Sequence, residues 1–351
     1  MKFGVALPTC TAGMLYPVPF ASAQDVVRVA VESEQLGYYE VMGNDHFTTQ
    51  RYVRETFADP PDFFDPLIAY AYCAARTSVL RLMTGVMVVP MRHPIVLAKQ
   101  LSTLDQFSDG RVIVGAGIGA YREEFENAFL NLKSVRRDEL MAESLVALKL
   151  LFEERRASFD GKHIRFRDVE MYPKPVQTPL PLYSAGNSDG AIRRAAELCD
   201  GWLPAGLPLE GVVAGKDKLE GWARAAGRDA SQLTIALQLI VCIGESSEQA
   251  SETFQRSQVY HHLVSLQQST LKDLDIDDYM TANLLGTPDD IYRQLQQLEE
   301  AGVSHLCGLI FVGNTVDEML DQIRMFGRHV VPSFPEKISP SVMSDRAAVS
   351  P

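Results

Sequence analysis

The segment Asn44-Asp45-His46-Phe47 contains residue types that can carry out proton chemistry. It follows a short apolar run, Tyr39–Met42, which we predict to be a buried strand. A histidine at the end of such a strand can donate a proton, stabilise an oxyanion or stack on an aromatic ligand near neutral pH. The alternative is a histidine that is bonded to Asp45 and has only a structural role. His46 is therefore a candidate catalytic residue.

The segment Ser184-Ala185-Gly186-Asn187-Ser188 has the composition of an anion-binding turn. It lies between a predicted strand, Leu180–Ala185, and a predicted helix, Asp189–Leu198. Small residues at the start of a helix leave backbone N–H groups free at its positive end, where a phosphate binds readily. An ordinary N-cap at Ser188, with Gly186 for the turn, would give the same pattern. The turn is a candidate phosphate site.

A predicted strand–helix–strand segment between Thr84 and Gly119 contains several glycines. The apolar run Gly85–Val89 predicts a strand, Pro94 opens a helix, and Arg111–Val114 begins the next strand. Strands joined in this way are parallel. The glycines lie at the strand ends, where a missing side chain lets the backbone approach a flat ligand. They are Gly85, Gly115, Gly117 and Gly119.

The same segment contains Gly115-x-Gly117-x-x-Ala120, which matches a relaxed dinucleotide-binding fingerprint. That fingerprint requires an acidic residue at the end of a following strand about 20 residues further on. A charged segment, Tyr121–Asn127, and a long helix follow instead, and the first strand carries no such motif. We therefore do not favour a dinucleotide site.

Strands and helices alternate along nearly the whole chain, which predicts an α/β protein with a (β/α)8 barrel. A doubly wound sheet is the alternative. The expected strands are Phe3–Leu7, Tyr39–Met42, Gly85–Val89, Arg111–Val114, Leu180–Ala185, Gly201–Pro204, Leu233–Ile243 and His305–Val312. The expected helices are Ala23–Leu36, Pro66–Arg76, the helix opened by Pro94, Arg137–Phe152, Asp189–Leu198, Lys216–Ala226, Ser247–Gln258, Pro288–Ala301 with Thr287 as N-cap, and Val316–Phe326.

We expect one barrel domain over residues 1–330. A short hairpin is predicted over Ala157–Phe166, with its turn at Asp160-Gly161. Residues 259–286 predict an irregular helical insertion before the last strand–helix unit. The Pro- and Ser-rich segment 331–351 has no periodicity and is expected to be a loose tail.

Composition excludes several classes of function. The formal net charge of −12 argues against a nucleic-acid partner, because phosphate binding requires clustered Lys and Arg. The five cysteines are widely spaced and form no CxxC pair, as expected of reduced thiols in a cytoplasmic protein. No run approaches the ~18 apolar residues of a membrane span, and the N-terminus reads as a strand rather than a leader peptide.

Four segments together resemble the bacterial-luciferase-like flavin-dependent oxidoreductases. They are GNDHF at 43–47, the tract 84–119, YREEF at 121–125 and SAGNSDGAIRRAAELCDGWLP at 184–204. The resemblance runs in the same order from about residue 1 to residue 330. It implies a (β/α)8 barrel, in agreement with the alternation of elements.

The resemblance also implies roles for particular residues. His46 matches the active-site histidine of the family, and Gly186-Asn187-Ser188, preceded by Ala185, matches the phosphate clasp of the flavin. Many members have a non-prolyl cis peptide under the flavin ring, and the matching bond here is Gly85–Val86. Relatives often have Trp at the position of Tyr121. Asp45, Gly85, Val86, Gly117, Tyr121, Ala185, Gly186, Asn187 and Ser188 are the expected cofactor contacts.

Within the family, the expected activity is that of a monooxygenase that uses reduced FMN and O2 on a small organic substrate, with a separate reductase supplying the flavin. Hydride transfer from an 8-hydroxy-5-deazaflavin coenzyme is the alternative, and a non-catalytic flavin-binding partner subunit is a second. A barrel enzyme that binds another phosphorylated ligand at the same turn also stays open. Members of the family are usually homodimers, so the resemblance implies a homodimer here. The sequence does not identify the substrate.

Other residues have ordinary explanations. The acidic pair Glu123-Glu124 lies at a predicted helix start, where carboxylates favour the helix dipole. His261 and His262 are adjacent and do not share a helix face, so we expect no metal site there. Loop aromatics near the proposed barrel mouth could line an apolar substrate pocket or simply pack the loops. They are Tyr16, Phe20, Phe47, Tyr52, Phe57, Phe63 and Phe64.

Overall fold

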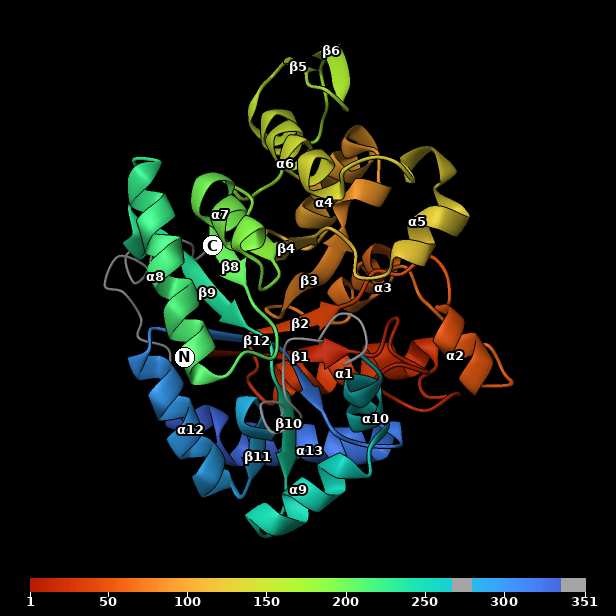
Figure 1. Cartoon of the computed structure of the whole chain (residues 1–351), viewed down its shortest axis with the longest axis vertical. Helices are drawn as coiled ribbons and strands as arrows, with labels where there is room; N and C mark the ends of the chain where they lie inside the picture. Colours follow the sequence, from red (N-terminus) through yellow and green to blue (C-terminus); the bar gives the residue numbers. More distant parts are fainter. Residues whose placement is uncertain (267–279, 336–351) are drawn as a thin grey trace, which may run out of the picture.

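A closed barrel of eight parallel strands forms the centre of the computed structural model, which describes residues 1–266 and 280–335 (Figure 1). Around the barrel the strands follow the order β1-β2-β3-β4-β7-β8-β9-β12, and β12 pairs with β1 to close it. They are β1 Lys2–Leu7, β2 Glu40–Gly43, β3 Arg81–Val88, β4 Val112–Gly117, β7 Leu182–Ala185, β8 Gly201–Leu203, β9 Thr234–Leu237 and β12 His305–Phe311. The predicted barrel is confirmed, and the doubly wound alternative is wrong.

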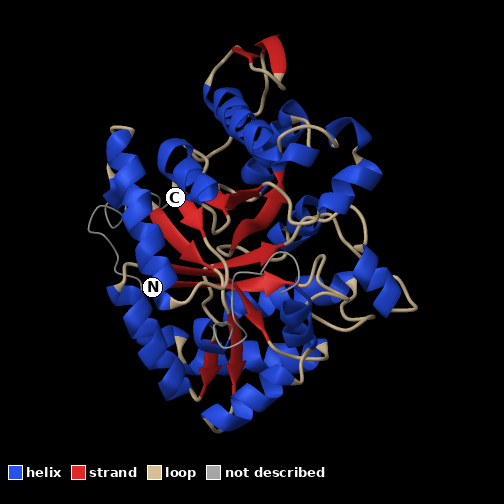
Figure 2. Cartoon of the chain, viewed as in Figure 1, coloured by secondary structure: helices blue, strands red, loops and turns tan. Residues whose placement is uncertain are grey.

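Helices surround the strands (Figure 2). They are α1 Ala23–Gln35, α2 Arg51–Thr56, α3 Pro66–Ala74, α4 Pro94–Phe107, α5 Arg122–Ala128, α6 Arg137–Glu153, α7 Asp189–Leu198, α8 Leu209–Ala225, α9 Ser247–Gln255, α10 Gln258–Leu266, α12 Pro288–Glu300 and α13 Val316–His329. The predicted N-cap of α12 is confirmed, since Thr287 and Asp290 form a capping box. Single 3-10 turns lie at Val89–Met91, Leu130–Leu132, Ala230–Gln232 and Val331–Ser333.

The seam between β1 and β12 depends on a buried carboxylate. The register of this pair shifts between Phe3 and Val5, and on β12 Gly308 adopts a left-handed conformation with φ +47°. The N–H of Gly308 donates to Glu40 Oε1 at 2.9 Å, and Glu40 is completely buried. A side chain at Gly4 would collide with this carboxylate. Gly4 therefore leaves room for Glu40, and Glu40 binds the backbone of β12 at Gly308, where the pairing with β1 is irregular.

Side chains fill the barrel interior. The inner cluster takes one buried residue from each barrel strand except β1, namely Met42, Met83, Ile113, Tyr183, Leu203, Ala236 and Cys307. Met42 lies between β3 and β12, where its atoms occupy the space that a side chain at Gly85 or Gly308 would need. The barrel is a packed core and not a pore.

Close packing requires glycine at the four strand-end positions. A Cβ at Gly85 would meet Met42, and one at Gly117 would meet Val86. A Cβ at Gly115 would meet the Thr84 carbonyl, and one at Gly119 would meet Phe125 and Val88. Neighbouring protein atoms fill the places of the missing side chains, so packing alone accounts for these glycines, and the approach of their backbone to a flat ligand stays a prediction.

The predicted seventh strand, Leu233–Ile243, is two strands. β9 ends at Leu237, and β10 Ile240–Ile243 runs between β12 and a short additional strand, β11 Leu284–Gly286. At the break, the backbone N–H of Ile240 donates to Asn283 Oδ1 at 2.8 Å. The sequence pattern does not show this break, because apolar residues continue through it.

Two short helices were not predicted. α2 lies in the expected loop 43–62, and α5 lies in the charged segment after β4. Neither helix has a side-chain N-cap. The first N–H of α2, at Arg51, donates instead to Glu123 Oε1 of α5 at 2.8 Å. Such short helices depend on tertiary contacts, which no local pattern reveals. α8 also begins earlier than predicted, at Leu209 instead of Lys216.

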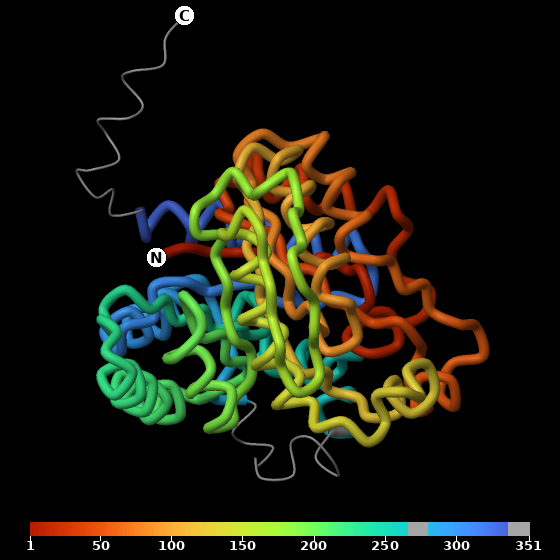
Figure 3. Tube along the Cα trace, turned by 90° about the horizontal axis from the view of Figure 1, so that it is seen from above, coloured from red at the N-terminus to blue at the C-terminus, as the bar shows by residue number. Residues whose placement is uncertain are grey.

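The predicted hairpin is present as β5 Ala157–Asp160 and β6 Arg165–Val169, an antiparallel pair that projects beyond the helices (Figure 1). The described end of the chain lies beside the N-terminal strand (Figure 3). There, the buried Phe334 makes an edge contact with Phe3 at 5.7 Å. Of the expected insertion, α10, β11 and the residues around them are described, and residues 267–279 lie outside the described residues. The rest of the expected tail, 336–351, also lies outside.

Candidate active site

The imidazole of His46 is fixed by a buried carboxylate from another loop of the barrel mouth. His46 follows β2, and Glu124 belongs to α5, which follows β4. Glu124 Oε2 lies 3.0 Å from His46 Nδ1, while Oε1 accepts hydrogen bonds from the N–H groups of Phe47 at 3.1 Å and Thr48 at 3.3 Å. Glu124 is completely buried. One carboxylate thus orients the ring and fixes the path of the loop that carries it.

This contact determines which nitrogen of His46 can act on a ligand. A carboxylate accepts a hydrogen bond, so Nδ1 carries the proton and Nε2 is the remaining nitrogen. No described residue makes a hydrogen bond with Nε2. The Gln50 side chain also lies 3.2 Å from Nδ1, and its Oε1 has no partner among the described residues. The geometry therefore leaves Nε2 to give or take a proton.

Aromatic and hydroxyl groups line the mouth beside His46. The rings of Tyr121 and Phe63 lie 5.5 and 5.8 Å from the imidazole. The hydroxyl of Tyr121 is 3.3 Å from that of Tyr52, which in turn is 3.1 Å from Nδ1 of His262 on α10. The rings of Tyr52 and His262 are stacked, with their centroids 5.7 Å apart. Three elements far apart in sequence therefore meet through one chain of polar contacts.

Burial determines the charge of this group. Burial, with a smaller effect from the nearby His46, lowers the pKa of His262 to about 4. Burial also raises the pKa of Tyr52 and of Tyr121. His262 is therefore neutral at physiological pH and both phenols keep their protons. A neutral Nδ1 can accept the hydrogen bond that the Tyr52 hydroxyl donates.

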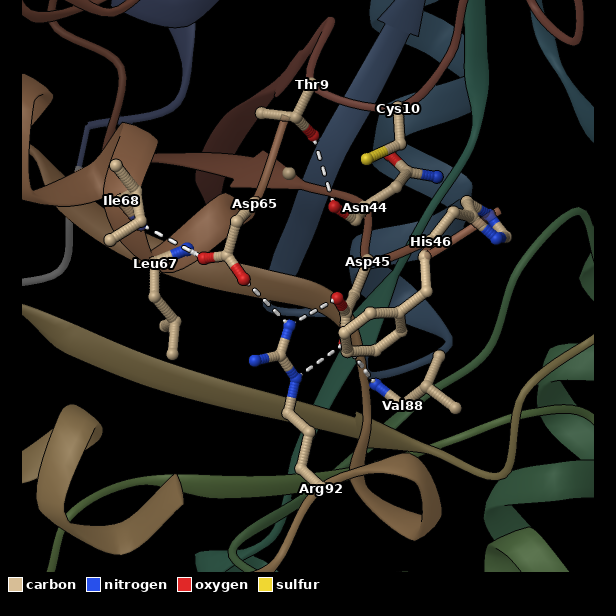
Figure 4. A network of polar contacts seen from close by, with 12 residues as sticks. Thr9, Cys10, Asn44, Asp45, His46, Asp65, Leu67, Ile68, Val88 and Arg92 are labelled. Atoms are coloured by element: carbon tan, nitrogen blue, oxygen red, sulfur yellow. Dashed lines mark hydrogen bonds and ion pairs between the residues drawn. The ribbon is translucent and has the colours of Figure 1, made fainter. Parts of the chain in front are cut away.

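Asp45 belongs to an ion-pair network beneath the loop (Figure 4). Its carboxylate accepts two hydrogen bonds from Arg92, at 2.7 and 3.1 Å, and one from the N–H of Val88 at 3.0 Å. Arg92 also donates to Asp65 at 3.0 Å, and Asp65 caps α3. The network joins the ends of β2 and β3. Both oxygens of Asp45 are engaged with protein, and its predicted contact with a cofactor stays a prediction.

The peptide bond between Gly85 and Val86 is cis, as the resemblance implied. The β3–β4 register shifts between Gly85 and Met87, so β3 is irregular at this point. Val86 is partly exposed, and its side chain lies against Gly117 at the end of β4. In the β2–β3 register, Gly43 lies opposite Thr84. The loop with His46 thus leaves β2 beside the Gly85–Val86 bond.

The turn after β7 has the open geometry expected of an anion site. Gly186 has φ +118°. Its N–H donates to Leu203 O and its C=O accepts from Trp202 Nε1, so both groups are bonded to β8. The backbone N–H groups of Asn187, Ser188, Asp189 and Gly190 donate to no described residue, and all four residues are exposed. Ser188 caps α7 by accepting from Ala191 N. The side chain of Asp189 is turned away and pairs with Lys218 at 2.8 Å. The N–H groups are therefore available to an anion.

The structure brings His46, Val86, Gly117 and Tyr121 to one half of the mouth, on β2, β3 and β4, and places Ala185–Ser188 at the end of the next strand, β7. The sequence does not indicate a site role for Glu124, which the helix dipole explains, or for His262, where only the absence of a metal site is expected. Within the described residues no group of three or more His, Cys, Asp or Glu could hold a metal ion. None of the helices described is long and apolar enough to cross a membrane.

Comparisons with known proteins show the family and the fold of the chain. Residues 1–305 match the family described as luciferase-like monooxygenase. An FMNH(2)-dependent dimethylsulfone monooxygenase of Pseudomonas putida is 30% identical over 76% of this chain and 77% of its own length. An F420-dependent glucose-6-phosphate dehydrogenase of Kineococcus radiotolerans is 26% identical over 79% and 84%. The crystal structure of the monooxygenase RslO1 from Streptomyces bottropensis superposes with a TM-score of 0.79 at 24% identity, covering 95% of this chain and all of that one.

The Asp45–Arg92 pair predicts a large loss of stability when one partner is removed. The side chains of Asp45 and Arg92 are only 2% and 10% exposed, so Asp45→Asn leaves the guanidinium without its main counter-charge. We expect the free energy of unfolding, measured with urea, to fall by about 3 kcal/mol. The exposed pair Arg51–Glu55 provides the control, because Glu55→Gln should change little. Equal effects of the two substitutions would contradict this account.

The lowered pKa of His262 predicts a specific loss of stability in acid. The unfolded chain binds this proton near pH 6.5 and the folded chain only near pH 4, so the contribution of His262 is complete above pH 6.5 and is lost as the pH falls towards 4. Between pH 7 and pH 4, the wild type should lose about 3 kcal/mol more than His262→Gln. Denaturant unfolding at each pH measures this difference. His261→Gln, at the exposed neighbour, should behave as the wild type does, and a His262→Gln curve parallel to the wild type would refute the prediction.

Proposed function

The chain belongs to the luciferase-like monooxygenase family of flavin-dependent oxidoreductases, and we propose that it is a monooxygenase that uses reduced FMN and O2 on a small organic substrate. The observation that carries this proposal is the pairing of His46 with Glu124 at the mouth of the barrel. It leaves Nε2 as a proton donor or acceptor on the loop that leaves β2 beside the Gly85–Val86 bond. A chain that only bound flavin would have no need of a histidine held in this way.

The residues present fit a flavin phosphate and ring. The N–H groups of residues 187–190 would hold the phosphate, because they point out of a helix start and have no partner among the described residues. Val86 would give the ring an apolar contact, with Gly117 behind it. When bound, the reduced flavin supplies the electrons for the reaction with O2. The role of Asp45 is to hold the ends of β2 and β3 together beneath this site.

His46 and its neighbours would control protons and water. Glu124 holds Nδ1, so that Nε2 can hold or deliver a proton at the reacting edge of the ligand. Phe63 and Tyr121 pack on the imidazole, and Phe47 lies at the rim with 43% of its surface exposed. These rings would limit the access of water to Nε2, which strengthens its electrostatic effect on a bound group.

Hydride transfer from an 8-hydroxy-5-deazaflavin coenzyme is the second candidate, because a relative at 26% identity is named for that coenzyme. Both candidates would use the same phosphate turn and the same histidine. The higher sequence identity to the dimethylsulfone monooxygenase supports FMN as the cofactor.

We further propose that a separate flavin reductase is a partner and that the chain forms a homodimer. We also propose a cytoplasmic location, which the five free, buried cysteines support.

Binding and turnover with the two cofactors test the proposal. Purified protein is titrated without oxygen with reduced FMN and with the reduced deazaflavin coenzyme, and turnover is then measured with and without O2, with dimethyl sulfone as the first substrate. We expect reduced FMN to bind, and any turnover to require O2. Binding of the deazaflavin alone, or faster turnover under strict anaerobiosis, would overturn the monooxygenase proposal.

Replacement of His46 tests its role in proton transfer. His46→Ala should lower turnover by roughly 10²–10⁴-fold, because general acid–base groups contribute that much, while reduced FMN still binds. Turnover and the dissociation constant of FMN are measured in parallel. His329→Ala, at an exposed position near the end of α13, is the matched control. Unchanged turnover in His46→Ala with normal flavin binding would remove the catalytic assignment.

A further inference from the structure

A cavity of about 170 Å³ lies at the carboxyl ends of strands on the other half of the barrel. It is bounded by residues that follow β8, by the break between β9 and β10, by β12 and by α10. The lining residues are Ala205, Gly206, Gln238, Leu239, Ile240, Leu263, Asn283 and Ile310. In a (β/α)8 barrel this end carries the chemistry.

The walls of this cavity are uncharged. Five of its lining residues are apolar side chains, and none is a Lys, Arg, His, Asp or Glu. Its two carboxamides are engaged with the backbone: Gln238 Nε2 donates to Gly308 O at 3.0 Å, and Asn283 Oδ1 accepts from Ile240 N at 2.8 Å. An anionic ligand would leave its charge without a counter-charge from the described walls, which is costly in a partly enclosed site.

The cavity and the proposed cofactor site occupy different strands. The expected flavin contacts lie on or directly after β2, β3, β4 and β7, whereas the cavity lies on or directly after β8, β9–β10 and β12. The two sets of strands are consecutive around the closed barrel. A second molecule in the cavity would therefore lie beside the flavin site without competing for the phosphate turn.

Helix α10 connects the cavity to His46. Leu263 of α10 lines the cavity, and the preceding residue, His262, bonds to Tyr52 and is close enough to His46 for the two imidazoles to interact electrostatically. Tyr52 in turn reaches Tyr121, whose ring lies against His46. The contact of His262 with Tyr52 therefore fixes the wall that Leu263 forms relative to the proposed catalytic histidine.

We propose that this cavity binds the substrate, that the substrate is an uncharged, mainly apolar molecule, and that His262 is a positioning residue that holds α10 as the cavity wall. The assignment of the cavity as a substrate site rests on the proposed function. A cavity of about 150 Å³ can hold benzene, so this one fits a molecule, or a part of a molecule, of roughly six to eight non-hydrogen atoms.

A pair of probes of equal shape tests the charge of the ligand. Pinacolone and pivalate have the same branched body, but pivalate carries a carboxylate where pinacolone carries a methyl ketone. Ligand-observed NMR with the purified full chain, without cofactor, gives the dissociation constant of each. We expect pinacolone to bind at least roughly tenfold more tightly than pivalate. Equal binding, tighter binding of pivalate, or no pinacolone binding at millimolar concentration would overturn the proposal.

Filling the cavity tests the location. Leu263→Trp should weaken pinacolone binding by roughly tenfold or more, because the larger side chain occupies the space. Ile310→Phe fills the same cavity from β12, so a disturbance of α10 by the first variant does not decide the outcome. The matched control is His261→Trp, at an exposed position on the same helix. Unchanged binding in both filling variants would place the ligand elsewhere.

Variants of the two neighbouring histidines test the positioning role. His262→Ala should weaken pinacolone binding, and His262→Asn should restore much of it because the amide oxygen can still accept from Tyr52. His261→Ala should bind as the wild type does. Equal loss in His262→Ala and His262→Asn, or none in either, would overturn the role of His262. Binding of reduced FMN is measured separately, so a failure of the cavity proposal is distinguishable from a failure of the proposed function.

Discussion

The contact between Glu124 and the residues after β2 is the interaction on which the site depends. A completely buried carboxylate must be matched by donors, and here the donors found among the described residues all come from one loop: two backbone N–H groups and the Nδ1 of His46. The same contact fixes the start of α5, whose other acidic residue, Glu123, receives the first N–H of α2. The orientation of the histidine and the path of two connecting segments therefore form one unit, and His46 cannot turn without breaking it.

The barrel determines where this unit is placed. Its strands end on one face, and the seam between β1 and β12 is held by Glu40 at the irregular residue Gly308. Met42 fills the interior between Gly85 and Gly308, so the Gly85–Val86 bond lies on a packed core. The result is a mouth with two halves: His46, Val86 and the phosphate turn on one, and an uncharged cavity on the other. Helix α10 joins the halves through His262 and Tyr52.

Much of this arrangement could be predicted from the sequence, and the rest could not for physical reasons. The alternation of elements predicted the barrel, and the family motifs predicted the cis bond at Gly85–Val86 and the open turn at Gly186. The partner of His46 could not be found, because Glu124 is 78 residues away and a local reading assigns a first-turn carboxylate to the helix dipole. Tyr52 and His262 are 210 residues apart, and their contact depends on α2 and α10, short helices that tertiary packing stabilises. The break between β9 and β10 depends on Asn283, which no strand pattern includes.

A crystal structure of the chain with reduced FMN, prepared without oxygen, tests the central claim most directly. That claim is that His46, held by Glu124, acts on a cofactor whose phosphate binds at the turn after β7. The account predicts density for the phosphate at the N–H groups of residues 187–190, the ring against Val86, and His46 Nε2 within hydrogen-bond distance of the ring, with the contact to Glu124 intact. A flavin bound elsewhere, or an imidazole turned away from it, would contradict the account.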